Sequence, residues 1–182
     1  MTGNLLIAGV GNIFLGDDGF GPEVARRLAG QPLPPWARVV DYGIRGMHLA
    51  YDLAGGYRSA ILVDATARGG EPGSLYLIEP DRQQPAGDPG DGLVASPLFN
   101  AHGMQPDVVL GMLSMLDAAE VEVLVLGCEP ATVDYGMGLS DPVAAAVDEA
   151  VRVVGDLVAR AAGSDGHQLA AREWAHVPRH SR

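Results

Sequence analysis

The stretch Gly9-Val-Gly-Asn-Ile-Phe-Leu-Gly-Asp-Asp-Gly-Phe-Gly21 follows directly on a short apolar run, Leu5–Val10. An uninterrupted apolar run of this length is typical of a strand that is buried on both faces. Pro22 comes immediately after the glycines and suits the first turn of a helix, which we expect to run to about Leu28. A strand, a glycine-rich turn and a helix in this order indicate the first part of a βαβ unit.

The rest of the chain continues this alternation. Short apolar runs predict four further strands, at 38–40, 60–63, 75–78 and 121–126. Helical spacing of apolar residues predicts helices at 46–53, 106–116 and 141–161. Alternating strands and helices form mostly parallel sheets with helices on both faces, so we predict a single three-layer α/β/α domain with a five-stranded sheet.

Two segments fall outside this pattern. Residues 80–97 are rich in Pro, Gly, Asp and Gln, which indicates a long surface loop. Residues 163–182 lose the helical periodicity, and we expect them to form a flexible C-terminal tail. The predicted α/β domain therefore covers residues 1–162.

The composition is that of an acidic globular protein. Of the 182 residues, 47% are hydrophobic and 19% are charged, and the net charge is −11. This acid excess argues against a nucleic-acid partner or docking on anionic membranes, because both need a cationic face. No apolar run approaches the roughly 20 residues that cross a bilayer, and the N-terminus has no basic leader. We therefore expect a cytoplasmic protein, and a monomer because no long apolar face stands out.

Acidic residues gather where the predicted strands end. Asp17 and Asp18 follow the first strand, Asp41 follows the second, and Asp64 follows the third. The carboxyl ends of parallel strands meet at one edge of a sheet, where ligands bind in open α/β folds. Together with His102, which precedes a predicted helix, Asp18 and Asp64 offer two hard oxygens and one imidazole nitrogen. Such a set suits Ni²⁺, Zn²⁺ or Mn²⁺.

Structural roles for the same residues stay open on spacing alone. Asp17, Asp18 and Asp64 can each cap a helix or a turn. His102 can order a loop, and Asp41 can anchor the turn that follows it.

Other classes of site fit the sequence less well. A dinucleotide site is disfavoured, because Phe14 stands where the third glycine of G-x-G-x-x-G belongs and two aspartates would repel a pyrophosphate. A serine hydrolase is disfavoured by the lack of a G-x-S-x-G elbow. The single cysteine, Cys128, excludes an internal disulfide and follows a predicted strand, which favours a buried, inert thiol.

Five segments of the chain, in order, resemble the motifs of the hydrogenase maturation proteases. They are Gly9 to Val24, Asp41-Tyr-Gly-Ile-Arg-Gly-Met-His-Leu49, Leu62-Val-Asp-Ala65, His102-Gly-Met-Gln-Pro-Asp-Val-Val-Leu110, and Gly127-Cys-Glu-Pro130 with Gly136-Met-Gly-Leu-Ser-Asp-Pro-Val143. The resemblance implies a twisted five-stranded sheet between helices. It also implies an endopeptidase that removes a short C-terminal extension from the large-subunit precursor of an [NiFe] hydrogenase after nickel insertion.

The resemblance also implies the metal-binding residues. The metal ligands of the family fall on Asp18, Asp64 and His102, and the nickel arrives with the substrate, without an organic cofactor. Many relatives carry Glu where this chain has Asp18, so its reach to a metal is one methylene shorter.

Two hypotheses of mechanism follow from this resemblance. Nickel bound to the precursor polarises the peptide carbonyl or a water, or it only anchors the substrate while Asp17 or another carboxylate serves as base. Asp41 and Arg45 are the candidates for shaping the substrate cleft. The alternative to an enzyme is a non-catalytic, nickel-dependent checkpoint or chaperone that binds the same precursor and releases it uncut.

Overall fold

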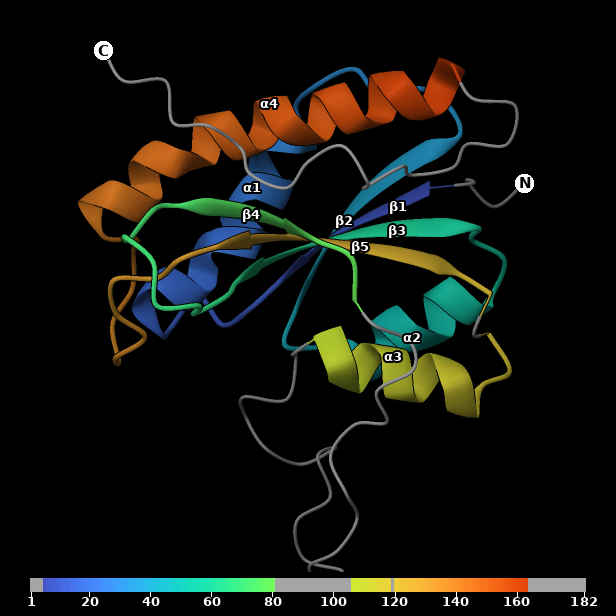
Figure 1. The fold of residues 1–182 in the computed structure, drawn as a ribbon, viewed down its shortest axis with the longest axis horizontal. Helices are drawn as coiled ribbons and strands as arrows, with labels where there is room; N and C mark the ends of the chain where they lie inside the picture. Colours follow the sequence, from blue (N-terminus) through green and yellow to red (C-terminus); the bar gives the residue numbers. More distant parts are fainter. Residues whose placement is uncertain (1–4, 81–105, 119, 164–182) are drawn as a thin grey trace, which may run out of the picture.

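The apolar runs form the strands of one sheet in the computed structural model, which describes residues 5–80, 106–118 and 120–163 (Figure 1). The strands are β1 (Leu5–Val10), β2 (Ala37–Gly43), β3 (Ser59–Ala65), β4 (Leu75–Ile78) and β5 (Glu122–Cys128). The helices are a short 3-10 turn η1 (Gly16–Gly19), α1 (Phe20–Leu28), α2 (Gly46–Ala54), α3 (Pro106–Met115) and α4 (Asp141–Gly163).

The sheet has the strand order β2-β1-β3-β5-β4. Strands β2, β1, β3 and β5 are parallel, and β4 pairs antiparallel with β5 at one edge. Helices α1 and α4 cover one face of the sheet, and α2 and α3 cover the other (Figure 1). The predicted three-layer α/β/α fold with a mostly parallel five-stranded sheet is therefore confirmed.

Alternate side chains of the strands enter two separate cores. Leu5 and Ile7 of β1 pack in the core beneath α1 and α4, whereas Leu6 and Ala8 pack beneath α2 and α3. All four are fully buried, as expected for a parallel sheet covered on both faces. Helix α4 contributes a buried stripe at the predicted helical spacing: Val143, Val147, Val151, Val154 and Val158.

Helix α1 approaches the sheet closely because its second residue, Gly21, has no side chain. A Cβ atom on Gly21 would lie 2.2 Å from the carbonyl oxygens of both Val10 and Val63. A Cβ atom on Gly9 would lie 2.4 Å from the carbonyl oxygen of Gly21. This backbone contact draws η1, and with it Asp17 and Asp18, onto the carboxyl ends of β1 and β3.

The element boundaries differ from the predicted ones in an informative way. β2 extends to Gly43 and β3 to Ala65, so Asp41 and Asp64 lie within strands rather than after them. Pairing lengthens both strands, because Asp41 lies opposite Gly9, and Asp64 lies opposite Gly127.

Helix α4 continues to Gly163, one residue into the predicted tail. Residues 164–182, and all but the first residue of the predicted loop at 80–97, lie outside the described residues. No helix in the described part of the chain is long and apolar enough to cross a membrane.

Candidate active site

Asp64 and Asp18 form an acidic pair at the carboxyl edge of the sheet. Asp64 ends the buried part of β3 and is only 6% exposed. Burial, and then the negative charge of Asp18, raise the pKa of Asp64 well above its ordinary value. A buried carboxyl group beside a second carboxylate forms a site that a cation would stabilise.

The loop after β1 folds around Asp18. The backbone N–H of Asn12 donates a hydrogen bond of 2.6 Å to Oδ2 of Asp18. Gly11 has a φ of 130°, and a Cβ atom there would lie 1.9 Å from the Asp18 carbonyl oxygen, so no other residue fits. The Asn12 amide lies in the turn where a dinucleotide pyrophosphate would bind. This amide already donates its hydrogen bond to Asp18. This arrangement argues further against a dinucleotide site.

Asp64 lies on the α2 and α3 side of the sheet. Side chains alternate along β3, and Ala60 and Leu62 pack in the core beneath α2 and α3. Asp64 shares this face, and α3 is the helix that follows His102 in the sequence. His102 itself lies outside the described residues, and within them no group of three His, Cys, Asp or Glu side chains could hold a metal ion. The structure therefore brings together two of the three predicted ligands.

Both carboxylates of this pair have the chemistry that a divalent cation requires. Their oxygens are hard ligands, and Asp64 accepts only a backbone hydrogen bond, from Ala65, among the contacts that affect its pKa. A cation beside Asp64 would offset both the cost of its burial and the repulsion from Asp18, the two causes that raise its pKa. The two residues therefore fit a divalent metal ion at this edge.

Asp17 has a different environment from its neighbour Asp18. It is fully buried, and its carboxylate accepts hydrogen bonds from the backbone N–H groups of Ala131 (2.8 Å), Thr132 (3.1 Å) and Ser140 (2.7 Å) and from the Ser140 hydroxyl (2.9 Å). Burial acts to raise its pKa, but these hydrogen bonds outweigh burial and lower the pKa overall. A carboxylate with its lone pairs engaged and a lowered pKa is a poor proton acceptor. The structure therefore argues against Asp17 as the base and shows it holding a loop.

Asp41 and Arg45 stabilise the turn after β2. The Asp41 carboxylate accepts a hydrogen bond of 2.8 Å from the N–H of Gly43, which is the turn-anchoring role that the spacing left open. The Arg45 guanidinium donates to the backbone carbonyl oxygens of Tyr42 and Asp41. Both side chains are exposed, and no contact described for either joins it to the Asp18 and Asp64 pair. Their role in shaping a substrate cleft stays a prediction.

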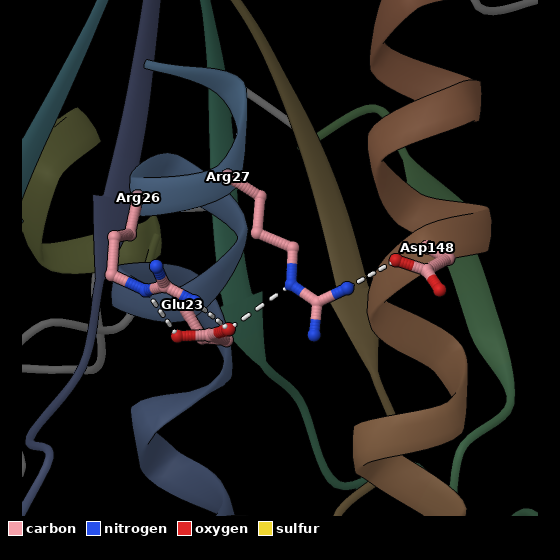
Figure 2. A network of polar contacts seen from close by, with 4 residues as sticks. All are labelled: Glu23, Arg26, Arg27 and Asp148. Carbon is pink, nitrogen blue, oxygen red and sulfur yellow. Dashed lines mark hydrogen bonds and ion pairs between the residues drawn. The ribbon is translucent and has the colours of Figure 1, made fainter. Parts of the chain in front are cut away.

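A groove of about 530 Å³ lies over α1, on the face of the sheet opposite α2 and α3. Its lining includes Ile13, Arg26, Arg27, Asp41 and Met137. In Figure 2 the carboxylate of Glu23 lies between the two arginines, and Arg27 also reaches Asp148 of α4. This network joins α1 to α4 and does not include either member of the acidic pair.

Two further residues close to the site are structural. Glu129 accepts hydrogen bonds from the N–H groups of Arg68 and Gly69 and from the Tyr76 hydroxyl, and it thereby holds the loop that follows β3. Cys128 is fully buried, and burial, followed by the charges of Asp17 and Glu129, raises the pKa of its thiol to about 12. The prediction that the thiol is buried is confirmed, and its lack of reactivity stays a prediction.

The sequence did not single out Ser140, although it supplies two of the four hydrogen bonds to Asp17. The available signal was the position of Ser140 directly before Asp141 and Pro142, at the start of the longest helix. A serine there suggests a helix cap, but its partner is a carboxylate from the other end of the chain.

Comparison with known proteins supports one family. A family model described as hydrogenase maturation protease matches residues 22–156. A relative from Methanocaldococcus jannaschii, whose name places it among the hydrogenase maturation proteases, is 33% identical over 155 residues; the match spans 83% of this chain and 94% of the relative.

Solved structures agree with this assignment. The hydrogenase maturating endopeptidase HybD from Escherichia coli is 25% identical with a TM-score of 0.68, covering 90% of this chain and 94% of that one. The hydrogenase 2 maturation peptidase of a Thaumarchaeota archaeon is 28% identical with a TM-score of 0.63, covering 86% of this chain and 98% of that one. Because the family model spans well over half of the sequence and the solved endopeptidases share the fold, this chain belongs to the hydrogenase maturation proteases, a family of peptide hydrolases.

Proposed function

We propose that this protein is the endopeptidase that removes the C-terminal extension from the large-subunit precursor of an [NiFe] hydrogenase, and that it recognises nickel already bound in the precursor. The observation that carries the proposal is the buried Asp64 beside Asp18, a carboxylate pair whose mutual repulsion a divalent cation would relieve. The resemblance of five ordered motifs and the membership of the family give the substrate class.

Nickel is part of the substrate in this proposal. Asp18, Asp64 and His102 fill coordination positions that the precursor's own ligands leave open, so the ion is read without being removed. Oxygen and nitrogen ligands suit a borderline divalent ion, and binding it favours the ionised form of Asp64. An unmetallated precursor leaves the Asp18 and Asp64 pair without its cation and therefore binds weakly.

Asp18, Asp64 and His102 would hold the precursor's nickel with the scissile peptide bond beside the carboxylate pair, and the ion would polarise the carbonyl or a water molecule. The water oxygen would add to the carbonyl carbon, and one water proton would pass to the amide nitrogen. The C–N bond would then break, which leaves a carboxyl group and a free amine. Asp17 does not take the proton in this scheme, because its oxygens are engaged in holding the 131–140 loop. We also propose that the enzyme works as a monomer in the cytoplasm and uses no organic cofactor.

The intact mass of the precursor tests this function. The large-subunit precursor, prepared with and without nickel, is incubated with the unmutated protein, with Asp64→Asn and with His102→Ala. We expect loss of a C-terminal fragment only from the nickel-loaded precursor and only with the unmutated protein. Asp117→Asn, at an exposed aspartate that follows α3, is the matched control and should cleave normally.

Each other outcome has a definite meaning. Binding of the nickel-loaded precursor without any loss of mass would favour a checkpoint or chaperone. Cleavage that does not depend on nickel would contradict recognition of the metal, and cleavage by either variant would contradict its assignment as a ligand.

A further inference from the structure

Large apolar side chains are exposed on the loops at the carboxyl edge of the sheet. Tyr135 is 96% exposed, Met137 is 74% exposed and Phe14 is 59% exposed. Further exposed apolar side chains are Ile13 and Val133 in the same loops, Ile44 after β2, and Met47 in the first turn of α2. Single exposed apolar residues are common on monomers, but a group of them at one edge marks an interaction site.

The strand order places these side chains on both flanks of Asp64. Ile44 follows β2, Phe14 follows β1 and Tyr135 follows β5, whereas Asp64 belongs to β3, which lies between β1 and β5. Neighbouring strands are about 4.8 Å apart, so β2 to β5 spans three intervals, or about 14 Å. Exposed apolar side chains therefore lie on both sides of β3 along this edge, as they do at the apolar centre of an interface with a folded partner.

Two of the loops, residues 12–16 and 131–140, are joined into one unit, which we call the paired loops. The N–H of Gly16 donates to the carbonyl oxygen of Gly136 at 2.8 Å, and the N–H of Gly136 donates to that of Phe14 at 3.0 Å. Asp17, directly after the first loop, accepts hydrogen bonds from residues at both ends of the second. The polar contacts hold the backbone in place, so the apolar side chains are presented outward without a loss of loop entropy on binding.

The paired loops are nearly free of charge in a strongly acidic protein. Asp134 is their one charged residue, whereas the whole chain carries 23 acidic and 12 basic residues. Depletion of charge together with exposed Tyr, Phe and Met is the composition of the centre of a protein–protein interface.

We propose that the paired loops are the docking surface for the folded body of the hydrogenase precursor, with Phe14, Tyr135 and Met137 as the principal contacts. The proposal rests on the proposed function. The same loop supplies Phe14 and the amide that binds Asp18, and the N–H of Phe14 donates to the Asn12 side chain at 3.0 Å. A partner that brings its metal to Asp18 therefore covers Phe14.

The test measures the cleavage kinetics of the nickel-loaded precursor with Phe14→Ser, Tyr135→Ser and the double variant. Tyr51→Ser is the matched control, since Tyr51 is 58% exposed but lies on α2. We expect KM to rise about 10-fold for each single variant and about 100-fold for the double variant, with kcat within a factor of about 3. The control should keep the unmutated KM.

A second measurement keeps this inference separate from the proposed function. Affinity for the nickel-loaded precursor is measured by surface plasmon resonance with Asp64→Asn/Tyr135→Ser and with Asp64→Asn alone. Weaker binding by the combined variant supports docking even where no cleavage is seen, whereas an absence of cleavage by the unmutated protein overturns only the proposed function. Unchanged KM and affinity in both loop variants would overturn the docking surface.

The identity of the occupant is tested with two further probes. If a synthetic peptide spanning the cleavage junction is cut by the unmutated protein with the same kcat/KM as the precursor, the folded body is not the occupant. If the unmutated protein sediments as a dimer and Tyr135→Ser as a monomer, the surface joins two copies of this chain. Either result would overturn the proposal.

Discussion

Asp17 and Ser140 stand 123 positions apart in the sequence, yet the Asp17 carboxylate accepts hydrogen bonds from both the backbone N–H and the hydroxyl of Ser140. The contact joins the turn after the first strand to the start of the last helix. The carboxylate is buried, and hydrogen bonds to an ionised group are among the stronger polar contacts in proteins. Asp17 is therefore a principal anchor of the 131–140 loop, beside the backbone hydrogen bonds that Gly136 makes with Phe14 and Gly16.

Asp17→Ala should lower the free energy of unfolding by about 2–4 kcal/mol, because three backbone N–H groups lose their buried acceptor. Asp17→Asn keeps one acceptor oxygen and should cost less. Urea unfolding followed by circular dichroism measures both. Asp134→Ala, in the exposed part of the same loop, is the control and should cost less than about 1 kcal/mol. An equal cost for Asp17→Ala and this control would contradict the structural role of Asp17.

Asp64 should make the substrate-free protein less stable as the pH rises. Its folded-state pKa is raised, so between the unfolded value and the raised value the folded state binds more protons than the unfolded state. Stability from this group is present at low pH and is lost as the pH rises through the folded pKa. The free energy of unfolding, measured from pH 4 to pH 8, should decline less for Asp64→Asn than for the unmutated protein. At pH 8 this variant should also have the higher melting temperature of the two. If Asp64→Asn were less stable than the unmutated protein at pH 8, the raised pKa of Asp64 would be contradicted.

Gly21→Ala should be strongly destabilising, by about 3 kcal/mol or more, because the added Cβ would overlap two strand carbonyl oxygens. The matched control is Gly155→Ala in α4, where a Cβ meets nothing within 4 Å. This second variant should stabilise the protein by about 0.5–1 kcal/mol through helix propensity. Thermal unfolding of the two variants should therefore shift in opposite directions, and shifts of the same sign would contradict the close approach of α1.

The Cys128 thiol should not react in the native state. Its pKa of about 12 leaves almost no thiolate at pH 8, and the side chain is fully buried. A chromogenic disulfide reagent, followed by absorbance, should release no chromophore at pH 8 while the protein is folded. After urea unfolds the chain, it should release one equivalent of chromophore per chain. Rapid labelling of the folded protein would place Cys128 at an accessible surface.

Glu23 should contribute to stability above the acidic range only. Hydrogen bonds from Arg26 and Arg27 lower its pKa to about 2 despite partial burial, so its contribution is present above the unfolded value of 4.5 and is lost as the pH falls toward 2. Both arginines are substantially exposed, so we expect Glu23→Gln to cost only about 1 kcal/mol at pH 7. The difference should shrink in 1 M NaCl, and a salt-independent difference would point to packing instead of charge.

The sequence predicted the fold well because a few apolar runs determine it. The runs at 5–10, 60–63 and 121–126 are buried strands, and no alternative position offers them a core. Strand ends were less predictable, since Asp41 and Asp64 are polar residues whose extended backbone depends on the neighbouring strand. Local sequence does not contain that information.

The roles of the carboxylates show what sequence cannot provide. Asp17 and Asp18 are identical and adjacent, and either suits a cap, a ligand or a base. The 3-10 turn directs Asp17 toward the 131–140 loop, whereas the charge of Asp18 acts on Asp64. The 131–140 loop lies more than 110 residues from Asp17 in the chain, so only the folded structure distinguishes Asp17 from Asp18. The third predicted ligand, His102, lies outside the described residues and stays a prediction.

The anchoring of the 131–140 loop has a consequence for protein engineering. Asp17 holds the loop at Ala131, Thr132 and Ser140, while the segment between them has two glycines with open space around them. The backbone of Gly136 in the middle of the loop is also bonded to Gly16 and Phe14, whereas the side chains of Tyr135 and Met137 are exposed. In the docking role that we propose, these side chains could be exchanged for those of a related protease while Gly136, Asp18 and Asp64 are kept. Partner choice and chemistry would then be encoded in separate parts of the chain.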